Sequence, residues 1–383
     1  MENSNGDVKA NISAVIFDLD GTLLSTEQVT RNILKDFLAK YGKLQDKEKE
    51  KKRLGMANNE AAIAIVNDYE LPLTPEQFTL EIMPMYHGLW QQAKALPGVN
   101  RLMKHLRKHG VPFALASNSI TKNIDAKISH HEGWKENFAT ILGSDQVKSG
   151  KPSPDMFLEA ANRMSVDTAN CLVIEDSLIG VKAGKAAGMK VVAVPSLQVE
   201  SHLYSIADSI LHSLLEIQPQ VWGLPQFGDW VDNTLPIEPI RITGLFSNGL
   251  ILEYEDGGWS ALPDQVWGLY IGWVKFDKQK VSKAVISVGW DLKCCDFKRK
   301  IQACTVEGID ESINDSKMHI LLVGYLRRSC HVGNMLENLE ILEEDILAAR
   351  ASLNLPAFSY NSLNSFLQGN SVKDNFTALN DNH

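Results

Sequence analysis

The hydrophobic pattern of the N-terminal half alternates short apolar runs with amphipathic segments of helix length. Five runs of strand length end in polar or charged residues or in a turn: AVIF at 14–17, VPFALAS at 111–117, FATILGS at 138–144, CLVIE at 171–175 and VVAVP at 191–195. Strands buried on both faces of a parallel sheet read as continuous apolar runs of this kind. The pattern therefore predicts an α/β domain with a Rossmann-like parallel sheet over residues 1–217.

Residues 26–95 interrupt this alternation and predict a helical cap inserted into the α/β domain. Apolar residues recur at helical spacing in three segments: 26–42, 58–71 and 74–96. The third segment is expected to bend or break at Pro84. The mixed-charge run at 46–53 is more typical of a solvated helix face than of a phosphate-binding patch. The loop at 54–59, which follows it, is predicted to contact the substrate and select it.

The first apolar run delivers two carboxylates into a turn at its carboxyl end. Asp18 and Asp20 leave the strand on the same side because side chains alternate along an extended chain. Carboxylates held this close repel each other, so a divalent cation would let one act as an ionised nucleophile while the other carries protons. Gly21 allows a sharp turn, and Thr22 offers a hydroxyl nearby. The alternative interpretation is a calcium-binding or merely solvated turn.

Further strand ends and the turns next to them carry groups that suit a phosphate site. They supply a hydroxyl, an amide, a lysine and an acidic pair: Ser117, Asn118, Lys151, Glu175 and Asp176. Taken alone, each has a structural alternative as a helix cap, a surface lysine or a capped turn. Because ligands of open α/β sheets bind outside the carboxyl ends of the strands, the shared position of these groups predicts a single site.

In their order along the chain, these motifs resemble the four motifs of the haloacid dehalogenase superfamily. The matching segments are DLDGT at 18–22, ASN at 116–118, KPSPD at 151–155 and EDS at 175–177. The resemblance implies a phosphomonoesterase that forms an aspartyl-phosphate on Asp18, with Asp20 as acid and then base. It also implies that Ser117, the backbone of Asn118 and Lys151 hold the phosphoryl oxygens.

The same resemblance implies a magnesium site. Mg²⁺ would be bound by an Asp18 oxygen, the Asp20 carbonyl and Asp176, because this hard cation prefers oxygen ligands. Glu175 and Thr22 would position these ligands without binding the ion themselves. The small helical cap of the superfamily implies a small phosphorylated metabolite as substrate.

Composition and charge narrow the range of partners. The 383 residues are 44% hydrophobic and 22% charged, which is ordinary for globular protein and sufficient for more than one domain. The net charge of −9 disfavours broad nucleic-acid contact, and neither a membrane span nor a leader sequence is indicated. Five cysteines without a C-x-x-C pair disfavour a disulfide or zinc framework. We expect a cytoplasmic protein without membrane or nucleic-acid partners, and a homodimer is an open alternative.

The pattern changes beyond about residue 217. Residues 218–239 are rich in Pro, Trp and Gly without periodicity, which predicts a linker. Residues 240–360 show short β-rich runs between polar turns and then one helical segment at 334–353, and residues 361–383 form a polar tail. We expect a small antiparallel β-barrel with a C-terminal helix.

Three runs in this half resemble the riboflavin kinase family: GLYIGWV at 268–274, AVISVGW at 284–290 and ILLVGYLR at 320–327. Nearly the whole chain resembles the plant family that joins a riboflavin kinase to an FMN hydrolase. This resemblance favours FMN or a related ribityl or sugar phosphate as the substrate.

Departures from the kinase pattern predict that the second domain is inactive. Residues 242–263 lack the Gly-rich loop and the Pro-Thr-Ala-Asn segment that hold Mg²⁺ and ATP phosphates in the family. By spacing, the catalytic Glu of the family falls on Gln302, whose amide is no general base at neutral pH. The family's Arg-Pro-Glu is Arg327, Arg328 and Ser329 here. Two other hypotheses stay open, namely a working bifunctional enzyme and a non-catalytic flavin-binding or scaffolding protein.

Overall fold

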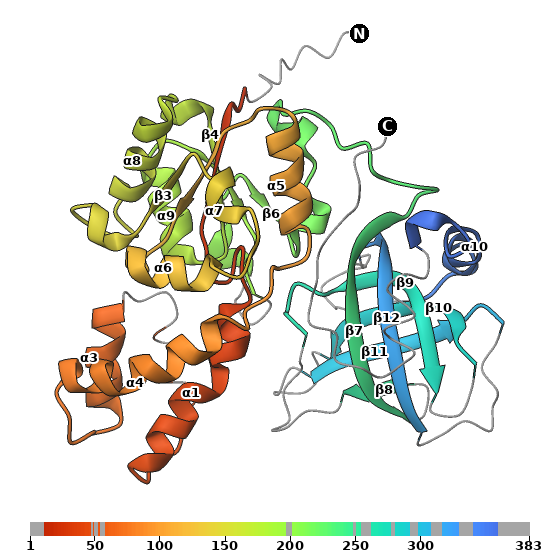
Figure 1. Cartoon of the computed structure of the whole chain (residues 1–383), viewed down its shortest axis with the longest axis horizontal. Coiled ribbons are helices and arrows are strands. Elements are labelled where there is room, and N and C mark those ends of the chain that lie inside the picture. The colour runs from red at the N-terminus through yellow and green to blue at the C-terminus, as the bar shows by residue number, and fades with distance from the viewer. Residues whose placement is uncertain are drawn as a thin grey trace. The chain divides into compact units, whose positions relative to one another are not determined.

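The computed structural model describes the chain from residue 11 to residue 358, apart from several short segments (Figure 1). The segments outside the description are 47–48, 50–52, 54–57, 197–200, 248–249, 254–261, 277–279, 292–297, 308–315 and 329–339. Most of the predicted substrate-reading loop and the whole predicted polar tail therefore lie outside the described residues. Among the helices that are described, none is long and apolar enough to cross a membrane.

The chain divides into two compact units. The first comprises Met1–Phe227 with Pro263–Val266, and the second comprises Gly228–Leu262 with Trp267–His383. The predicted linker at 218–239 is packed at both of its ends, because Trp222 and Leu224 belong to the core of the first unit and a barrel strand begins at Leu235.

A six-stranded parallel sheet forms the centre of the first unit, in the order β3-β2-β1-β4-β5-β6. Its strands are β1 (Ala14–Phe17), β2 (Phe113–Ala116), β3 (Thr140–Leu142), β4 (Cys171–Glu175), β5 (Lys190–Ala193) and β6 (Ser209–Ile210). In this register Val15 pairs with Phe113 on one side and with Leu172 on the other. The predicted Rossmann-like parallel sheet is confirmed.

The two faces of this sheet are covered by different helices. Along β1, Val15 and Phe17 pack into one apolar core while Ala14 and Ile16 pack into a second, as alternation along a strand requires. The first core also includes residues of α5 (Val99–Lys108), α6 (Thr121–Ile128) and α7 (Trp134–Asn137). The second includes residues of α8 (Asp155–Met164) and α9 (Leu178–Ala186). Both faces of β1 are thus buried, which explains its unbroken apolar sequence.

The helical cap lies between β1 and α5 in sequence and has an apolar core of its own. Its helices are α1 (Thr26–Lys40), α3 (Asn58–Asp68) and α4 (Pro75–Trp90). Of the two outcomes predicted at Pro84, the break is wrong, because α4 runs through this residue, and the bend stays a prediction. Proline frees the carbonyl of Leu80 from its helical hydrogen bond, but the Leu80 residue is 76% exposed, so water can satisfy that carbonyl.

The chain enters and leaves the cap through two adjacent segments. Leu24 forms a bridge with Ala95, and the backbone N–H of Ser25 donates to the carbonyl of Lys94 at 3.0 Å. The Ser25 hydroxyl in turn accepts from the Lys94 N–H at 3.3 Å. The two crossings therefore form one hydrogen-bonded junction.

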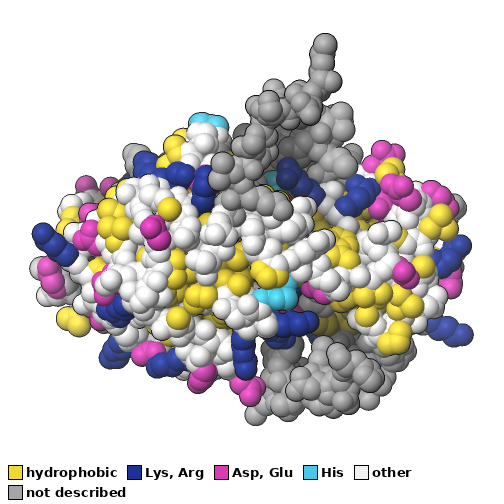
Figure 2. Space-filling model, turned by 90° about the horizontal axis from the view of Figure 1, so that it is seen from above, with side chains coloured by type: hydrophobic (Ala, Val, Ile, Leu, Met, Phe, Trp, Pro, Cys, Tyr) yellow, Lys and Arg dark blue, Asp and Glu magenta, His cyan; other side chains and the backbone are white. Residues whose placement is uncertain are grey.

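The second unit is a closed antiparallel barrel in the order β10-β11-β8-β7-β12-β9. Its strands are β7 (Leu235–Ser247), β8 (Leu250–Glu253), β9 (Gly268–Phe276), β10 (Ser282–Asp291), β11 (Lys298–Thr305) and β12 (Ser316–Arg327). The predicted barrel with a helix after it is confirmed. On the face shown in Figure 2, acidic and basic side chains are scattered among one another over the described residues.

The helix that follows the barrel is shorter than the sequence pattern indicates. α10 (Glu343–Ser352) begins at Glu343, whereas the predicted segment began at Asn334, part of which lies outside the described residues. The Leu342 N–H donates to the carboxylate of Asp345 at 2.8 Å, and acidic residues fill the first turn. The helix begins there because the Asp345 carboxylate accepts from the Leu342 N–H and because negative charge is favourable at a helix N-terminus.

Candidate active site

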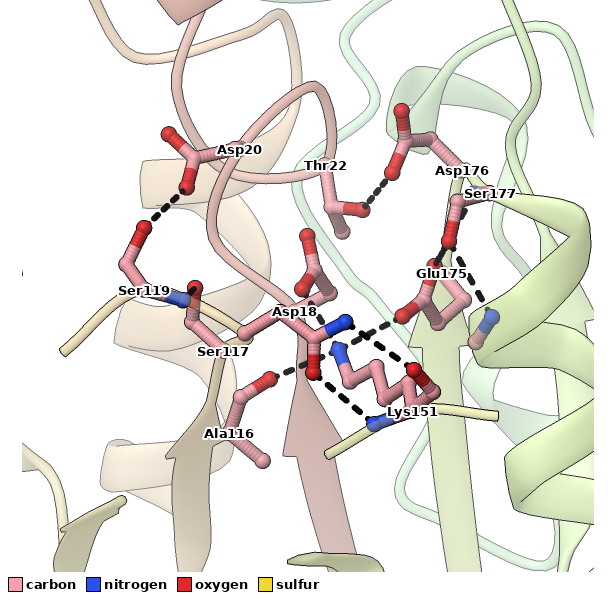
Figure 3. A network of polar contacts seen from close by, with 12 residues as sticks. Asp18, Asp20, Thr22, Ala116, Ser117, Ser119, Lys151, Glu175, Asp176 and Ser177 are labelled. Atoms are coloured by element: carbon pink, nitrogen blue, oxygen red, sulfur yellow. Dashed lines mark hydrogen bonds and ion pairs between the residues drawn. The ribbon is translucent and has the colours of Figure 1, made fainter. Parts of the chain in front are cut away.

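The predicted site residues of the first unit come together at the carboxyl edge of the sheet (Figure 3). Lys151, from the turn before α8, makes the central contacts. Its ammonium donates to Asp18 Oδ1 and to Glu175 Oε1, each at 2.6 Å, and to the carbonyl of Ala116 at 2.8 Å. These bonds use all three donors of the ammonium group, and the Lys151 residue is only 4% exposed. Lys151 is thus fixed beside the predicted nucleophile.

Glu175, the last residue of β4, holds Lys151 in place. Its second carboxylate oxygen, Oε2, accepts from the Ser177 N–H at 2.9 Å and from the Ser177 hydroxyl at 2.8 Å. On its other side Gly180 of α9 provides the space, since a Cβ there would lie 1.7 Å from Glu175 Oε1. Both oxygens of Glu175 are therefore engaged by the protein itself.

Asp18, Glu175 and Asp176 form an acidic cluster whose ligand atoms all lie within 4.8 Å of one another. Burial, with smaller contributions from Glu175 and Asp20, raises the pKa of Asp18 to about 7 in spite of the neighbouring Lys151. Burial and the adjacent Glu175 also raise the pKa of Asp176 well above its ordinary value. Such raised pKa values mark negative charge that the protein groups do not neutralise, so the donor set fits a hard divalent cation.

The turn after β1 and a distant tyrosine position Asp176. The Thr22 hydroxyl donates to Asp176 Oδ1 at 3.1 Å, and the Tyr204 hydroxyl donates to the Asp176 carbonyl at 2.8 Å. Gly21 has φ of 82°, and a Cβ at this position would lie 2.2 Å from Asp176 Oδ2. Only glycine fits this turn, both for its backbone conformation and for the space it leaves to the carboxylate.

The residues after β2 have different contacts. The buried Ser117 accepts a hydrogen bond from the Ser119 N–H on its hydroxyl oxygen at 3.1 Å. The side chain of Asn118 holds the backbone of Lys151: it accepts from the Lys151 N–H at 2.8 Å and donates to the Lys151 carbonyl at 3.2 Å. The predicted contacts of Ser117 and of the Asn118 backbone with phosphate stay predictions.

Sequence reasoning missed two residues that contact Asp20. The Lys127 ammonium lies 2.7 Å from each carboxylate oxygen of Asp20, and the Ser119 hydroxyl donates to Asp20 Oδ2 at 3.1 Å. Burial alone would raise the pKa of Asp20, but the charge and hydrogen bonds of Lys127 outweigh it, so the pKa is lowered. A sequence signal existed, because Lys127 follows Asn123 and Ile124 at helical spacing on the buried face of α6.

Known families match both units. Residues 15–194 match the model of the haloacid dehalogenase-like hydrolases, and residues 259–353 match the riboflavin kinase model. A bifunctional riboflavin kinase/FMN phosphatase of Arabidopsis thaliana is 43% identical over 370 residues, which is 94% of this chain and 97% of the relative. The chain belongs to the family that joins a haloacid dehalogenase-like hydrolase to a riboflavin kinase domain. It is thus a phosphoric monoester hydrolase, as the motifs predicted.

Further matches concern the first unit alone. A (DL)-glycerol-3-phosphatase of Arabidopsis thaliana is 37% identical over 228 residues, which is 58% of this chain and 95% of the relative. A solved haloacid dehalogenase hydrolase of family IA from Entamoeba histolytica superposes with a TM-score of 0.50 at 23% identity, covering 55% of this chain and 97% of that one. The structural match supports the fold of the phosphatase domain.

One altered and one retained residue of the kinase-like domain lie on described strands. Gln302, at the position of the family's catalytic Glu, lies on β11 opposite Ser287 of β10. Arg327 donates to both carboxylate oxygens of Asp345, at 2.9 and 2.7 Å, and so ties β12 to α10. Ser329 lies outside the described residues, as do residues 248–249 and 254–261 of the segment that departs from the kinase loops.

Proposed function

We propose that the first unit hydrolyses FMN, or a related ribityl or sugar phosphate, through an aspartyl-phosphate on Asp18. The observation that carries this proposal is the buried contact of Lys151 with Asp18 inside an acidic cluster at the carboxyl edge of the sheet. FMN is favoured over other phosphate esters because the relative that aligns with nearly the whole chain is named for FMN.

In the first step, an Asp18 carboxylate oxygen attacks phosphorus while the bond from phosphorus to the alcohol oxygen breaks. The electron pair of that bond goes to the leaving oxygen, which takes a proton from Asp20. Because Lys127 lowers the pKa of Asp20, Asp20 first receives this proton from the bound monoanion of the phosphate ester. Lys151, Ser117 and the Asn118 backbone hold the non-bridging phosphoryl oxygens.

In the second step, Asp20 accepts a proton from water as the water oxygen attacks phosphorus. The bond from phosphorus to the Asp18 oxygen breaks, and its electron pair returns to Asp18 as a carboxylate. Inorganic phosphate leaves with the proton that Asp20 accepted, and Asp20 returns to its ionised resting state.

We further propose Mg²⁺ as the resident cation, held by Asp18, Asp176 and the carbonyl of Asp20. When bound, it would neutralise charge on the phosphoryl group and the cluster of carboxylates. The engagement of both Glu175 oxygens by Lys151 and Ser177 supports a ligand role for Asp18 and Asp176 and a supporting role for Glu175.

The kinase-like domain is proposed to be inactive, as Gln302 and the missing phosphate-binding segments suggest. A working bifunctional enzyme remains the second candidate, favoured by the match of residues 259–353 to the riboflavin kinase model. Incubation of the full-length protein with riboflavin, ATP and Mg²⁺ should give no FMN above the no-enzyme control. FMN formation that disappears when residues after Glu238 are removed would establish the bifunctional enzyme instead. A cytoplasmic location and a homodimer also stay proposals.

The phosphatase proposal is tested with Asp18→Asn, measured as phosphate release from FMN and from a panel of sugar and polyol phosphates. The substitution is nearly isosteric but removes the nucleophile, so phosphate release should fall by several orders of magnitude while the protein still folds. Asp36→Asn, on an exposed position of α1, is the matched control and should keep wild-type activity. Phosphate release retained by Asp18→Asn would rule out the covalent mechanism.

A further inference from the structure

The buried ammonium of Lys127 contacts both carboxylate oxygens of Asp20. Lys127 is 5% exposed, and its ammonium reaches both oxygens of one carboxylate at 2.7 Å. The same ammonium donates to the Ser119 hydroxyl at 2.9 Å, and that hydroxyl donates to Asp20 Oδ2. Lys127, Ser119 and Asp20 therefore form a closed triangle of polar contacts.

The cap fixes Lys127 from another direction. The ammonium lies 4.7 Å from the centre of the Trp90 ring, which is a cation–π distance. Trp90 is the last residue of α4 and is itself buried. With the Trp90 ring and the Ser119 hydroxyl both in contact with the ammonium, little freedom of position is left to it.

A purely stabilising role does not explain this arrangement well. Removing a lysine from water is costly, and buried ion pairs are often replaced by apolar residues without loss of stability. The position of Lys127 on the apolar face of α6 would suit a leucine or methionine. What a lysine adds here is a fixed direction for the Asp20 carboxylate, which has to meet both the leaving oxygen and the attacking water.

We infer that Lys127 is a positioning residue that orients the Asp20 carboxylate for proton transfer in both steps of phosphate ester hydrolysis. This inference rests on the proposed function, in which Asp20 is the acid and base. Lys127 acts on the Asp20 carboxylate, both of whose oxygens its ammonium contacts at 2.7 Å, and not on the phosphoryl group. Replacing Lys127 should therefore lower kcat/KM most for substrates whose leaving group needs a proton.

The test compares two leaving groups in Lys127→Met and Lys127→Arg. An alkoxide needs a proton as it leaves, whereas p-nitrophenolate is a stable anion that needs none. With glycerol 3-phosphate or FMN, kcat/KM of Lys127→Met should fall about 100-fold or more, the usual range for a general acid. With p-nitrophenyl phosphate, kcat/KM should fall less than about fivefold. Lys127→Arg, which keeps a donor to carboxylate oxygens, should recover part of the alkyl activity.

A second readout follows from the base role in the second step. Lys127→Met should form the aspartyl-phosphate rapidly from p-nitrophenyl phosphate but hydrolyse it slowly. Rapid mixing should then show a burst of p-nitrophenolate approaching one equivalent per active site, followed by a slow steady state. Lys135→Met is the matched control, because Lys135 makes an ion pair of the same 2.7 Å length with Asp125 on the surface. It should behave as wild type.

Equal losses for the two leaving groups in Lys127→Met and Lys127→Arg would overturn the positioning role, as would wild-type rates with both substrates. Circular dichroism and the unfolding midpoint report whether each variant folds, and Lys127→Arg keeps the test decisive if Lys127→Met does not. Failure of the proposed function itself looks different: wild type and Lys135→Met would then release no phosphate, or Asp18→Asn would release as much as wild type.

Discussion

Replacing Gly180 by alanine should lower the activity by displacing Glu175, which holds Lys151 in the active site but does not itself contact the substrate. A Cβ at this position would lie 1.7 Å from Glu175 Oε1 and 2.4 Å from Oε2. Non-bonded carbon and oxygen atoms keep roughly 3 Å apart, so the carboxylate has to move by roughly 1 Å or more. The 2.6 Å contact with Lys151 then lengthens towards the limit of a hydrogen bond.

The size of the effect follows from burial. Glu175 is 0% exposed and Lys151 is 4% exposed, and breaking a buried ion pair costs about 3 to 5 kcal/mol. Alanine is the better helix former by about 1 kcal/mol, so the net loss of unfolding free energy should be about 2 to 4 kcal/mol. Because Lys151 also contacts Asp18, a displacement of about 1 Å should lower kcat/KM by about 100-fold.

Gly184→Ala on the same helix is the matched control. Its Cβ would lie 2.9 Å from a methyl group of Val191 and 3.4 Å from Val173, both apolar neighbours in the core. We expect a loss of about 0 to 2 kcal/mol and kcat/KM within about threefold of wild type. Urea denaturation and steady-state phosphate release measure both quantities. Gly180→Ala with wild-type kcat/KM, or with a loss no larger than that of Gly184→Ala, would refute the reasoning.

Two further predictions concern the acidic cluster. Phosphate release should require Mg²⁺ and be inhibited by excess Ca²⁺, which takes the same oxygen ligands but prefers more of them at longer distance; full activity in excess chelator would contradict this. In metal-free protein, the pKa of Asp18 is raised from 3.8 to about 7, so between these pH values the folded state holds a proton that the unfolded chain has lost. Stability should therefore fall by about 3 kcal/mol as pH rises from 5 to 8, and Mg²⁺ should remove most of this slope. Urea denaturation with and without Mg²⁺ measures it, and a metal-free protein whose stability does not change over this range would contradict the prediction.

The strand ends were predictable because parallel strands buried on both faces leave an unmistakable apolar pattern. Asp18 and Glu175 follow from that pattern, since each lies at the end of a strand. Lys151, in the turn before α8, was found from its KPSPD motif instead. The role of Lys127 did not follow. Its partner Asp20 lies 107 residues away in the chain, and no local pattern states which buried lysine faces which carboxylate.

Helix propensity alone also did not predict where helices continue or begin when solvent exposure or helix capping decides this. Proline normally breaks a helix, but Pro84 lies where the freed carbonyl of Leu80 belongs to an exposed residue. The helix after the barrel was expected from Asn334 because its apolar residues recur at helical spacing upstream of Glu343. Its observed start is set by the contact between the Leu342 N–H and Asp345, a carboxylate that Arg327 of the barrel also holds.

The junction between Leu24–Ser25 and Lys94–Ala95 makes the cap a replaceable module. Because the chain leaves and re-enters the sheet domain through neighbouring residues, the ends of any inserted segment need only be as close together as two paired strands. Caps of different length could thus be exchanged during evolution without moving the residues of the acidic cluster. For protein engineering, Ser25 and Lys94 are the natural points at which to graft the cap of another hydrolase and so change substrate range while the acidic cluster stays in place, provided that Trp90, which contacts Lys127, is kept.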